Sequence, residues 1–404
     1  MVPKLRFKNF DGEWESKSLN DIACLTSSKR VHLSDYVKEG IPFFRGKEIT
    51  ELNNGIIPSD ILYISPSLFN DFKVKHGAPK KGEILITAVG TLGNIYHIGD
   101  LGDFYFKDGN LIWLKELKCD SLFLSSLLTL KKNEILNSAI GSTQKALTMV
   151  ELNKLVFNYP KNDEQTKVAN FISSVDEKIT LLNKQYDLLC RYKKEMLQKV
   201  FSQELRFKDD SGDDFSDWEE VALKNIASKV NTKNRDNLVS TVLTNSATQG
   251  IVSQESYFER EIVTESNLKG YYVVKIGDFV YNPRISSTAP VGPIKMNELT
   301  QGVMSPLYTV FRFEKGFLKF YQYFFESSVW HNYMKSVANS GARHDRMNIS
   351  GADFFDLPVP QPSDEEQTKI ARFISAIDDK ITTKKTELEN LKTWKQGLLQ
   401  QLFV

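Results

Sequence analysis

The side chains able to do chemistry in this 404-residue sequence do not fall into a catalytic pattern. No G-x-x-x-x-G-K-S/T stretch occurs, which excludes the phosphate loop of a nucleotide-driven motor, and no H-E-x-x-H zinc motif occurs. The five histidines are scattered, and the three cysteines are odd in number and far apart. Such spacing predicts no metal site and is typical of a reduced intracellular protein. We therefore expect no catalysis and no bound metal in this chain.

The sequence is richer in groups that bind than in groups that react. Cations suit phosphates, and guanidinium, amide and hydroxyl groups suit the edges of bases. Such groups gather in polar stretches of loop-like composition: Lys29, Arg30, Arg45, Lys47, Lys73, Lys75, Ser142, Thr143, Gln144, Lys145, Arg284, Ser286, Arg343, His344, Arg346 and Asn348. Arg343, His344 and Arg346 form the densest basic cluster of the second half, and Arg45 stands beside two phenylalanines. Each cluster alone is also typical of a solvated surface. Whether these groups form a binding surface therefore depends on the helices and strands that position them.

Those elements come from a duplication. EQTKVANFISSVDEKIT at 164–180 returns as EQTKIARFISAIDDKIT at 366–382, with twelve of seventeen positions identical. PKLRF at 3–7 returns as QELRF at 203–207, and Trp14 matches Trp218. A looser match runs from a glycine-led polar stretch to a proline, at 141–160 and again at 341–360. The repeat predicts two related halves.

The repeated segments at 164 and 366 begin helices. In the second copy Ser363 and Glu366 fit a capping box with Ser363 as N-cap, and Asn162-Asp163-Glu164 plays a similar part in the first copy. Each helix carries an apolar seam whose spacing alternates four and three. The seam residues are Val175, Ile179, Leu182, Leu189 and Met196, then Ile377, Ile381, Leu388, Leu391 and Leu398. Lys193 and Lys395 interrupt both seams at the same place. Two separate amphipathic helices are one interpretation. The other is that they pack on each other.

Connectivity favours an antiparallel pair, since the first helix delivers the chain to the second body and the second helix starts there. We therefore expect Val404 to return near Met1. The stretch from Asp176 to Val200 is roughly 38 Å long at 1.5 Å per residue, about one turn of duplex DNA.

The bodies between these elements are mixed α/β. Strand-like runs occupy 56–64, 83–89, 104–114, 271–281 and 307–313, and helical patterns occupy 121–138 and 317–338. We predict an α+β fold with two similar mixed α/β domains joined by two long antiparallel helices, a pseudo-twofold internal repeat. The expected boundaries are 1–160 and 203–360 for the domains, and 161–202 and 361–404 for the helical spacers.

Several stretches resemble the DNA-specificity subunit of Type I restriction–modification systems. They are LRFKNFDGEW, IPFFRGKEIT, KKGEILITAVGTLGN, GSTQKALTMVELNKLVFNYP and DEQTKVANFISSVDEKI, and the likeness covers nearly the whole chain. The resemblance implies two target-recognition domains, each reading one half of a bipartite sequence in double-stranded DNA, with the helices as spacer. The basic clusters named above are then the expected DNA contacts.

The same resemblance implies the partners. Two DNA adenine methyltransferase subunits would dock on this non-catalytic chain, and the near-identical helical segments would offer each the same surface. Motor–nuclease subunits would complete the assembly. No cofactor is expected in this chain, while S-adenosylmethionine, ATP and Mg²⁺ are expected in the partner subunits.

Composition leaves an alternative open. The sequence contains no membrane span and no signal peptide, so we expect a cytoplasmic protein. Its net charge is only +1, which favours slightly a coiled-coil scaffold that binds proteins and no DNA. The Arg-, Lys- and Gln-bearing stretches in both halves disfavour that scaffold.

Overall fold

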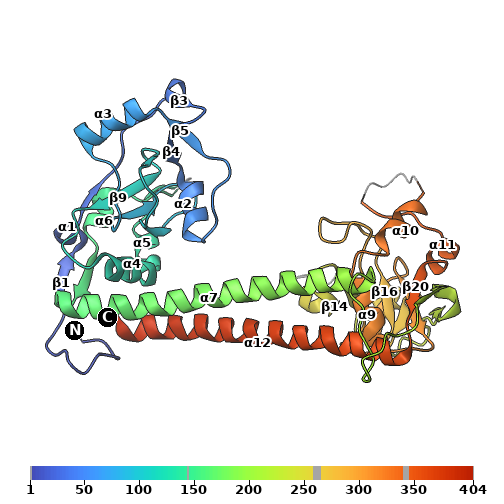
Figure 1. Cartoon of the computed structure of the whole chain (residues 1–404). Coiled ribbons are helices and arrows are strands. Elements are labelled where there is room, and N and C mark those ends of the chain that lie inside the picture. The colour runs from blue at the N-terminus through green and yellow to red at the C-terminus, as the bar shows by residue number, and fades with distance from the viewer. Residues whose placement is uncertain (1, 143–144, 258–264, 340–344, 404) are drawn as a thin grey trace. The chain divides into compact units, whose positions relative to one another are not determined.

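The computed structural model describes residues 2–142, 145–257, 265–339 and 345–403 (Figure 1). The chain divides into two compact units. Unit 1 is Met1–Asn183 with Thr386–Val404, and unit 2 is Lys184–Lys385. Two long helices, α7 (Asn162–Phe201) and α12 (Asp364–Leu402), contribute a segment to each unit. The mixture of sheets and long helices confirms the predicted fold class.

The same antiparallel four-stranded sheet lies in both units. In unit 1 its order is β2-β9-β6-β7, formed by Cys24–Thr26, Leu111–Lys115, Ile84–Thr87 and Ile95–His97. In unit 2 its order is β12-β19-β16-β17, formed by Ala227–Lys229, Thr309–Phe313, Phe279–Tyr281 and Ile294–Met296. The central strands β6 and β16 are wholly buried, because both faces of these short apolar strands are covered. The two bodies therefore share one framework.

A two-stranded ribbon closes each unit onto its helices. In unit 1, β1 (Glu15–Ser18) pairs with β10 (Val156–Tyr159). In unit 2, β11 (Glu219–Ala222) pairs with β20 (Pro358–Gln361). Each ribbon joins the strand after the repeated tryptophan to the strand before the repeated long helix. It thus ties the start of each half to its end.

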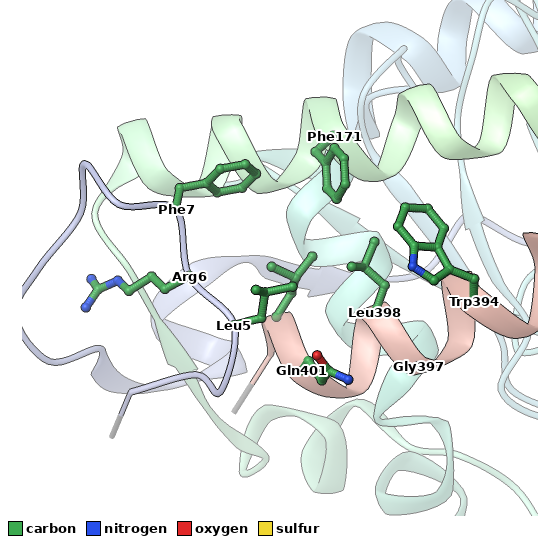
Figure 2. A pocket seen from close by; sticks show the side chains of 9 residues that line it. Leu5, Arg6, Phe7, Phe171, Trp394, Gly397, Leu398 and Gln401 are labelled. Carbon is green, nitrogen blue, oxygen red and sulfur yellow. The ribbon is translucent and has the colours of Figure 1, made fainter.

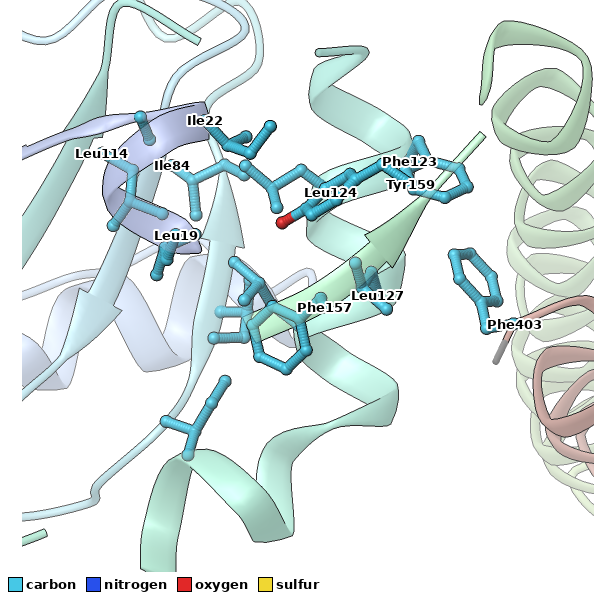
Figure 3. Close-up of a cluster of buried hydrophobic side chains, with 14 of the residues drawn as sticks. Leu19, Ile22, Ile84, Leu114, Phe123, Leu124, Leu127, Phe157, Tyr159 and Phe403 are labelled. Atoms are coloured by element: carbon cyan, nitrogen blue, oxygen red, sulfur yellow. The ribbon is translucent and has the colours of Figure 1, made fainter. Parts of the chain in front are cut away.

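Short helices cover the shared sheets. Unit 1 has α1 (Leu19–Ile22), α4 (Ser121–Leu130), α5 (Lys132–Asn137) and α6 (Met149–Asn153). Unit 2 has α9 (Leu318–Glu326), α10 (His331–Ser336) and α11 (Gly351–Phe355), with a 3₁₀ turn at Leu223–Asn225. In the core of unit 1, Phe403 from the end of α12 stacks near Phe123 of α4, beside the buried Tyr159 (Figure 3).

The units differ in the elements that are added to the shared sheet. Unit 1 builds a second sheet, β3-β5-β4-β8, from Tyr36–Val37, Leu62–Ile64, Ile41–Phe44 and Tyr105–Phe106. It adds a 3₁₀ turn at Leu33–Asp35, α2 (Gly46–Asn53) and α3 (Pro66–His76). Unit 2 has instead the hairpin β13–β14 and the pair β15–β18, formed by Leu243–Ser246, Gly250–Ser253, Tyr272–Val274 and Gly302–Met304. It also has α8 (Gln254–Tyr257) and a 3₁₀ turn at Glu265–Gly270.

Several predicted elements are interrupted. The run 104–114 breaks into two strands at Gly109, and the run 271–281 breaks at Gly277, because both glycines take a positive φ that turns the chain. Only 62–64 of the run 56–64 is a strand, and both predicted helical stretches split in two. The loop-like composition was misleading in two places. Arg45-Gly46-Lys47 starts helix α2, and Lys73 to His76 ends helix α3.

A buried ion pair is repeated at the base of each unit. Arg6 donates from Nε and Nη2 to the carboxylate of Glu164, at 2.8 and 2.7 Å. Arg206 donates in the same way to Glu366, at 2.9 and 3.1 Å. Both glutamates are buried, and both arginines also donate to backbone carbonyls of the following turn. We call these pairs the two arginine locks.

Neighbouring residues repeat as well. Gln165 accepts from the backbone of Asp120 and donates to Pro160 O, while Gln367 accepts from Phe317 and donates to Pro362 O. Ser363 caps α12 through the backbone of its Glu366, as the sequence predicts. The Glu366 side chain does not return to the cap, however, because it serves the lock. The repetition of Glu and Gln in the EQTK segment is thus explained by contacts inside each unit, and not only by a surface that both units share.

The seam lysines also have internal partners. In unit 1, Lys395 pairs with Asp176. In unit 2, Lys193 pairs with the equivalent Asp378 at 2.6 Å and with Glu326 at 2.7 Å. Burial by itself lowers the pKa of Lys193, but the two carboxylates outweigh it and raise that pKa above the ordinary value. The predicted seam residues are buried or half-buried, and within each unit the two helical segments run in opposite directions (Figure 1).

The two ends of the chain meet in unit 1. The backbone N–H of Leu5 donates to the carbonyl of Gln401 at 2.9 Å. This contact agrees with the expectation that a duplicated chain with antiparallel helices returns to its start (Figure 1).

The arginine lock predicts a local loss of stability. Arg206→Met leaves the fully buried carboxylate of Glu366 without its cation, which should cost roughly 3 kcal/mol. Hydrogen exchange should then rise in 203–222 and remain unchanged in 3–18, where Arg6 and Glu164 are intact. Lys208→Met is the control, because its pair with Asp214 is exposed on both sides and should be worth under about 1 kcal/mol. Equal protection of 203–222 in both variants would contradict the lock.

The joined termini predict a viable circular permutant. Linking the native ends by about six flexible residues and opening the chain between Ser202 and Gln203 should give a folded protein, because both residues are exposed and lie at the junction between the two repeats. Thermal melting followed by circular dichroism should lie within a few degrees of the parent. A chain opened inside β16 should fail to fold, and equal failure of both permutants would refute the expectation.

Candidate nucleic-acid interface

Each unit has a polar cleft beside its shared sheet. The first cleft, of about 590 Å³, is lined by Arg45, Gly46, Lys47, Thr50, Glu51, Val89, Gly90, Thr91 and Asn110. The second cleft, of about 240 Å³, is lined by Thr244, Asn245, Ser246, Ala247, Asn282, Pro283, Arg284, Ile285, Ser286, Pro293, Leu307, Tyr308 and Arg346. Although few residue types match, the two clefts lie at equivalent places beside the shared sheet.

Strand pairing establishes that equivalence. In unit 1, β4 runs parallel to β8, and the first cleft starts where β4 ends. In unit 2, Val242 forms a parallel bridge with Val303 of β18, and the second cleft starts along the following strand, β13. The opposite walls are the loops after β6 and β16. Asn110 and Leu307 occupy the same register position before the equivalent strands β9 and β19.

The glycine-led loops attach to these walls at matching points. The N–H of Leu147 donates to Ala88 O at 3.0 Å, and the N–H of Met347 donates to Pro283 O at 2.8 Å. The loose sequence match between 141–160 and 341–360 is therefore a real structural correspondence. It joins Leu147 to Ala88, next to Val89 in the lining of the first cleft, and brings Arg346 into the lining of the second.

Amide groups form the floor of the second cleft. Asn245 is 3% exposed and donates its amide to Val280 O at 2.7 Å and Pro293 O at 3.1 Å. Its Oδ1 has no hydrogen-bond partner among the described residues. Asn282 donates to the backbone carbonyl of Asn245 at 3.0 Å. Because a side-chain amide can both donate and accept, such a floor suits ligands with defined polar edges.

Two arginines stand at the rim of the second cleft. Arg284 lies 3.5 Å from the carboxylate of Asp345, and Arg346 lies 3.9 Å from the same carboxylate. The side chain of Arg284 is 66% exposed. Two guanidinium groups thus share one acid at long distances. The rim keeps a net positive charge and N–H groups suited to an anionic ligand.

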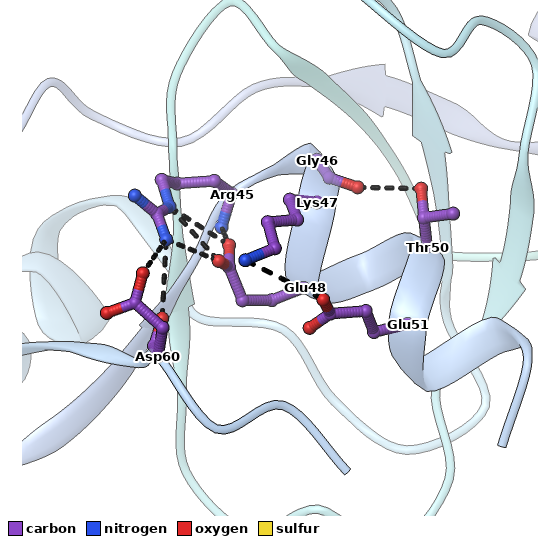
Figure 4. Close-up of polar contacts among 7 residues, drawn as sticks. All are labelled: Arg45, Gly46, Lys47, Glu48, Thr50, Glu51 and Asp60. Atoms are coloured by element: carbon purple, nitrogen blue, oxygen red, sulfur yellow. Dashed lines mark hydrogen bonds and ion pairs between the residues drawn. The ribbon is translucent and has the colours of Figure 1, made fainter. Parts of the chain in front are cut away.

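The first cleft uses its arginine differently. Arg45 Nε lies 3.1 Å from both oxygens of Glu48, whose carboxylate also accepts from the Arg45 backbone at 2.7 Å (Figure 4). Burial alone would raise the pKa of Glu48, but the bonds from Arg45 outweigh it and keep that pKa below its ordinary value. Arg45 therefore fixes the start of α2, and its guanidinium is largely occupied. The Lys47 side chain is 61% exposed, and its ammonium lies 3.8 Å from Glu51, at the long end of the range for an ion pair. Lys47 is therefore the more available cation of the two.

The wall of the first cleft is held by side chains. Asn94 donates to Thr50 Oγ1 at 3.0 Å and accepts from Lys132 Nζ at 3.0 Å. Thr50 in turn donates to Gly46 O at 2.8 Å (Figure 4). These bonds connect α2, the loop after β6 and α5, so the cleft is a fixed feature of the fold.

The other predicted residues are more dispersed. Arg30 pairs with Asp108 at 3.2 Å, and Lys29 is exposed beside it. The side chains on α3 pair within unit 1, Lys73 with Asp103 and Lys75 with Asp71. Ser142, Lys145 and Asn348 are exposed, and Ser286 lines the second cleft. Thr143, Gln144, Arg343 and His344 lie outside the described residues.

Sequence reasoning missed the floor of the second cleft. Four polar residues of this cleft were not predicted: Thr244, Asn245, Asn282 and Tyr308. The hydroxyls of Thr244 and Tyr308 lie 3.2 Å apart there. Three polar residues in a row, Thr244 to Ser246, form a buried strand, which is unusual enough to have served as a signal.

Other kinds of site find no support in the part of the chain that the structure describes. There, no three His, Cys, Asp or Glu side chains gather as a metal would require. No helix among these residues combines the length and apolar character needed to cross a bilayer.

Known proteins resemble the chain in both sequence and fold. The model of the Type I restriction modification DNA specificity domain matches residues 11–190 and again 215–393. A putative type I restriction enzyme MjaX specificity subunit from Methanocaldococcus jannaschii is 24% identical over 96% of this chain and 92% of its own length. The putative specificity subunit S.HindORF215P from Haemophilus influenzae is 28% identical, but the match spans only 44% of this chain and 46% of that protein.

Solved structures agree on the fold. The S subunit of a Type-I restriction-modification system from M. genitalium aligns with a TM-score of 0.55 at 18% identity, covering 100% of this chain and 99% of that one. A chain from work on complex assembly and conformational transition of the type I R-M system gives 0.54 at 14% identity, covering 97% and 98%.

The match to the domain model supports a role in DNA specificity and not the alternative of a scaffold that binds no DNA. The domain model covers both halves of the sequence, in the same order as the duplicated sheets, clefts and locks. The chain therefore belongs to the family of Type I restriction–modification DNA specificity proteins and carries the family's domain twice.

Proposed function

We propose that this protein reads a bipartite sequence in double-stranded DNA, with one half-site at the cleft of each unit. The observation that carries this proposal is the pair of clefts, which share a topological place and differ in chemistry. A common framework presents each reading surface in the same way, while different side chains select different bases. The long helices α7 and α12 would then serve as the spacer between the half-sites.

The second cleft offers the clearer reading chemistry. The Arg284 and Arg346 guanidinium groups suit phosphate oxygens or the O6 and N7 edge of a guanine. The exposed Lys29, Arg30 and Lys47 of unit 1 supply cations of the kind that positions a duplex without reading it. Exposed residues of the two glycine-led loops, such as Lys145 and Asn348, would extend both surfaces.

The proposed assembly assigns the chemistry to other chains. Two DNA adenine methyltransferase subunits would dock on this protein, and motor–nuclease subunits would join them. S-adenosylmethionine, ATP and Mg²⁺ would be held by those subunits, and this chain would take no part in bond making. Membership of the specificity family supports this division of labour.

The half-site proposal predicts separable specificity changes. In the complex reconstituted with its methyltransferase subunits, Arg284→Ala or Arg346→Ala should relax or lose recognition in one half-site only. Loss of a bidentate base contact should cost roughly 1–3 kcal/mol at a single position. Lys47→Ala, in unit 1, should affect the other half alone, and the two sets should combine almost additively. The measurement is methylation of a DNA library randomised at both half-sites.

A salt titration separates the types of contact. A residue that binds only phosphate should weaken all sequences alike and reduce the salt slope by about one. Lys224→Ala serves as the control, because Lys224 pairs with Asp356 outside the second cleft and should leave both half-sites unchanged. A change of base preference in both half-sites from any single variant would overturn the two-reader model.

A further inference from the structure

An apolar pocket unrelated to the clefts opens on the surface of unit 1. It measures about 440 Å³ and is lined by Leu5, Arg6, Phe7, Phe171, Trp394, Gly397, Leu398, Gln401 and Leu402 (Figure 2). Its walls are the LRF segment, the start of α7 and the end of α12. The clefts proposed for DNA leave this pocket without a role.

Gly397 keeps the pocket open. It lies inside helix α12, where a glycine is less stable than an alanine by roughly 1 kcal/mol. A Cβ built on Gly397 would meet no described atom within 4 Å, so packing does not require a glycine. The missing side chain instead leaves a gap beside Trp394 and Leu398 (Figure 2).

Large apolar side chains around this gap remain partly exposed to solvent. Trp394 is 49% exposed and Leu5 is 40% exposed. Phe171 packs edge-on against both Phe7, at 5.8 Å, and Trp394, at 6.2 Å, which gives a continuous row of rings (Figure 2). Covering such a row stabilises a complex, and tryptophan is prominent among residues that anchor protein interfaces.

The surroundings of the pocket are basic. The two segments that form most of its walls, 2–8 and 390–403, contain five Lys or Arg residues and no Asp or Glu, and of these cations Arg6 and Lys395 are paired with Glu164 and Asp176 of α7. Lys4 and Lys8 are exposed and form no ion pair among the described residues, while the Lys167 ammonium lies 5.7 Å from the Phe7 ring centre. The occupant that fits best therefore carries apolar side chains flanked by acidic ones. The α12 lining positions recur at helical spacing, which suits a helix laid alongside.

Unit 2 offers a different surface at the equivalent place. Glu195 stands where unit 1 has Gly397, and Tyr192 stands where it has Trp394. Glu204 replaces Lys4 and pairs with Lys199 at 3.0 Å. An apolar, acidic helix would meet a carboxylate at the centre of this site, which is unfavourable both by charge and by burial.

We propose that the two halves of this protein bind partner subunits unequally, and that the pocket opened by Gly397 is the tighter site. Its occupant is an amphipathic helix with apolar residues flanked by acidic ones. Resting on the proposed function, that helix belongs to the methyltransferase subunit. The first subunit binds at unit 1, and the second binds more weakly at unit 2.

The test titrates the full-length chain with the purified methyltransferase subunit, without DNA, and counts bound subunits by native mass spectrometry. The parent should load in two steps of different affinity. Gly397→Leu should fill the pocket and weaken the first step at least tenfold. Gly397→Ala is the matched control, since it adds only a methyl group and should keep the first step. Trp394→Ala, at an exposed position, should weaken the same step if Gly397→Leu folds poorly.

A reciprocal variant tests unit 2. The double change Tyr192→Trp with Glu195→Gly should tighten the second step toward the first. Two equal steps in the parent, or a first step unaffected by both Gly397→Leu and Trp394→Ala, would overturn this inference and leave the proposed function standing. Failure of the parent to bind any methyltransferase subunit would overturn both.

Discussion

The fold depends on a buried carboxylate at the start of each long helix. Glu164 and Glu366 are removed from water, and Arg6 and Arg206 stabilise them there by donating two N–H groups each. The same arginines hold the turn that precedes the repeated tryptophan. In unit 2, Trp218 also donates to Glu366 at 2.9 Å, whereas Trp14 Nε1 has no partner among the described residues. One ion pair thus connects the beginning of each half to its closing helix.

With that connection fixed, the rest of each unit has two kinds of region. The ribbons, the four-stranded sheets and the starts of the long helices repeat in both units. Each of them is hydrogen-bonded to the arginine lock or to a neighbouring repeated element. The inserted elements do not repeat, since unit 1 has a second sheet with α2, and unit 2 has the pairs β13–β14 and β15–β18. Because the inserted elements differ in sequence, two clefts at equivalent places can differ in chemistry. In the first cleft Glu48 binds the Arg45 guanidinium, and in the second cleft side-chain amides form the floor.

The sequence was most informative where spacing carries meaning. The heptad seam, the shared interruption by Lys193 and Lys395, and the paired glycine-led loops all follow from periodicity or repetition. The cleft chemistry was harder, because a cation in the sequence does not show which acid lies beside it in space. Arg45 was expected to contact DNA, and its guanidinium forms an ion pair with Glu48, three residues later in the sequence. Asn245 was not predicted, because its role depends on carbonyls 35 and 48 positions away.

The return of the chain to its start has a consequence for the order of synthesis. The core of unit 1 includes Leu398, Leu399, Leu402 and Phe403, which are synthesised only after the whole of unit 2. Unit 2, made of one continuous stretch, can close first. Domains usually fold in the order in which they are made, but here the half that is made first is finished last. Until then, the face of Phe123 and Trp14 that Phe403 will cover stays open to water.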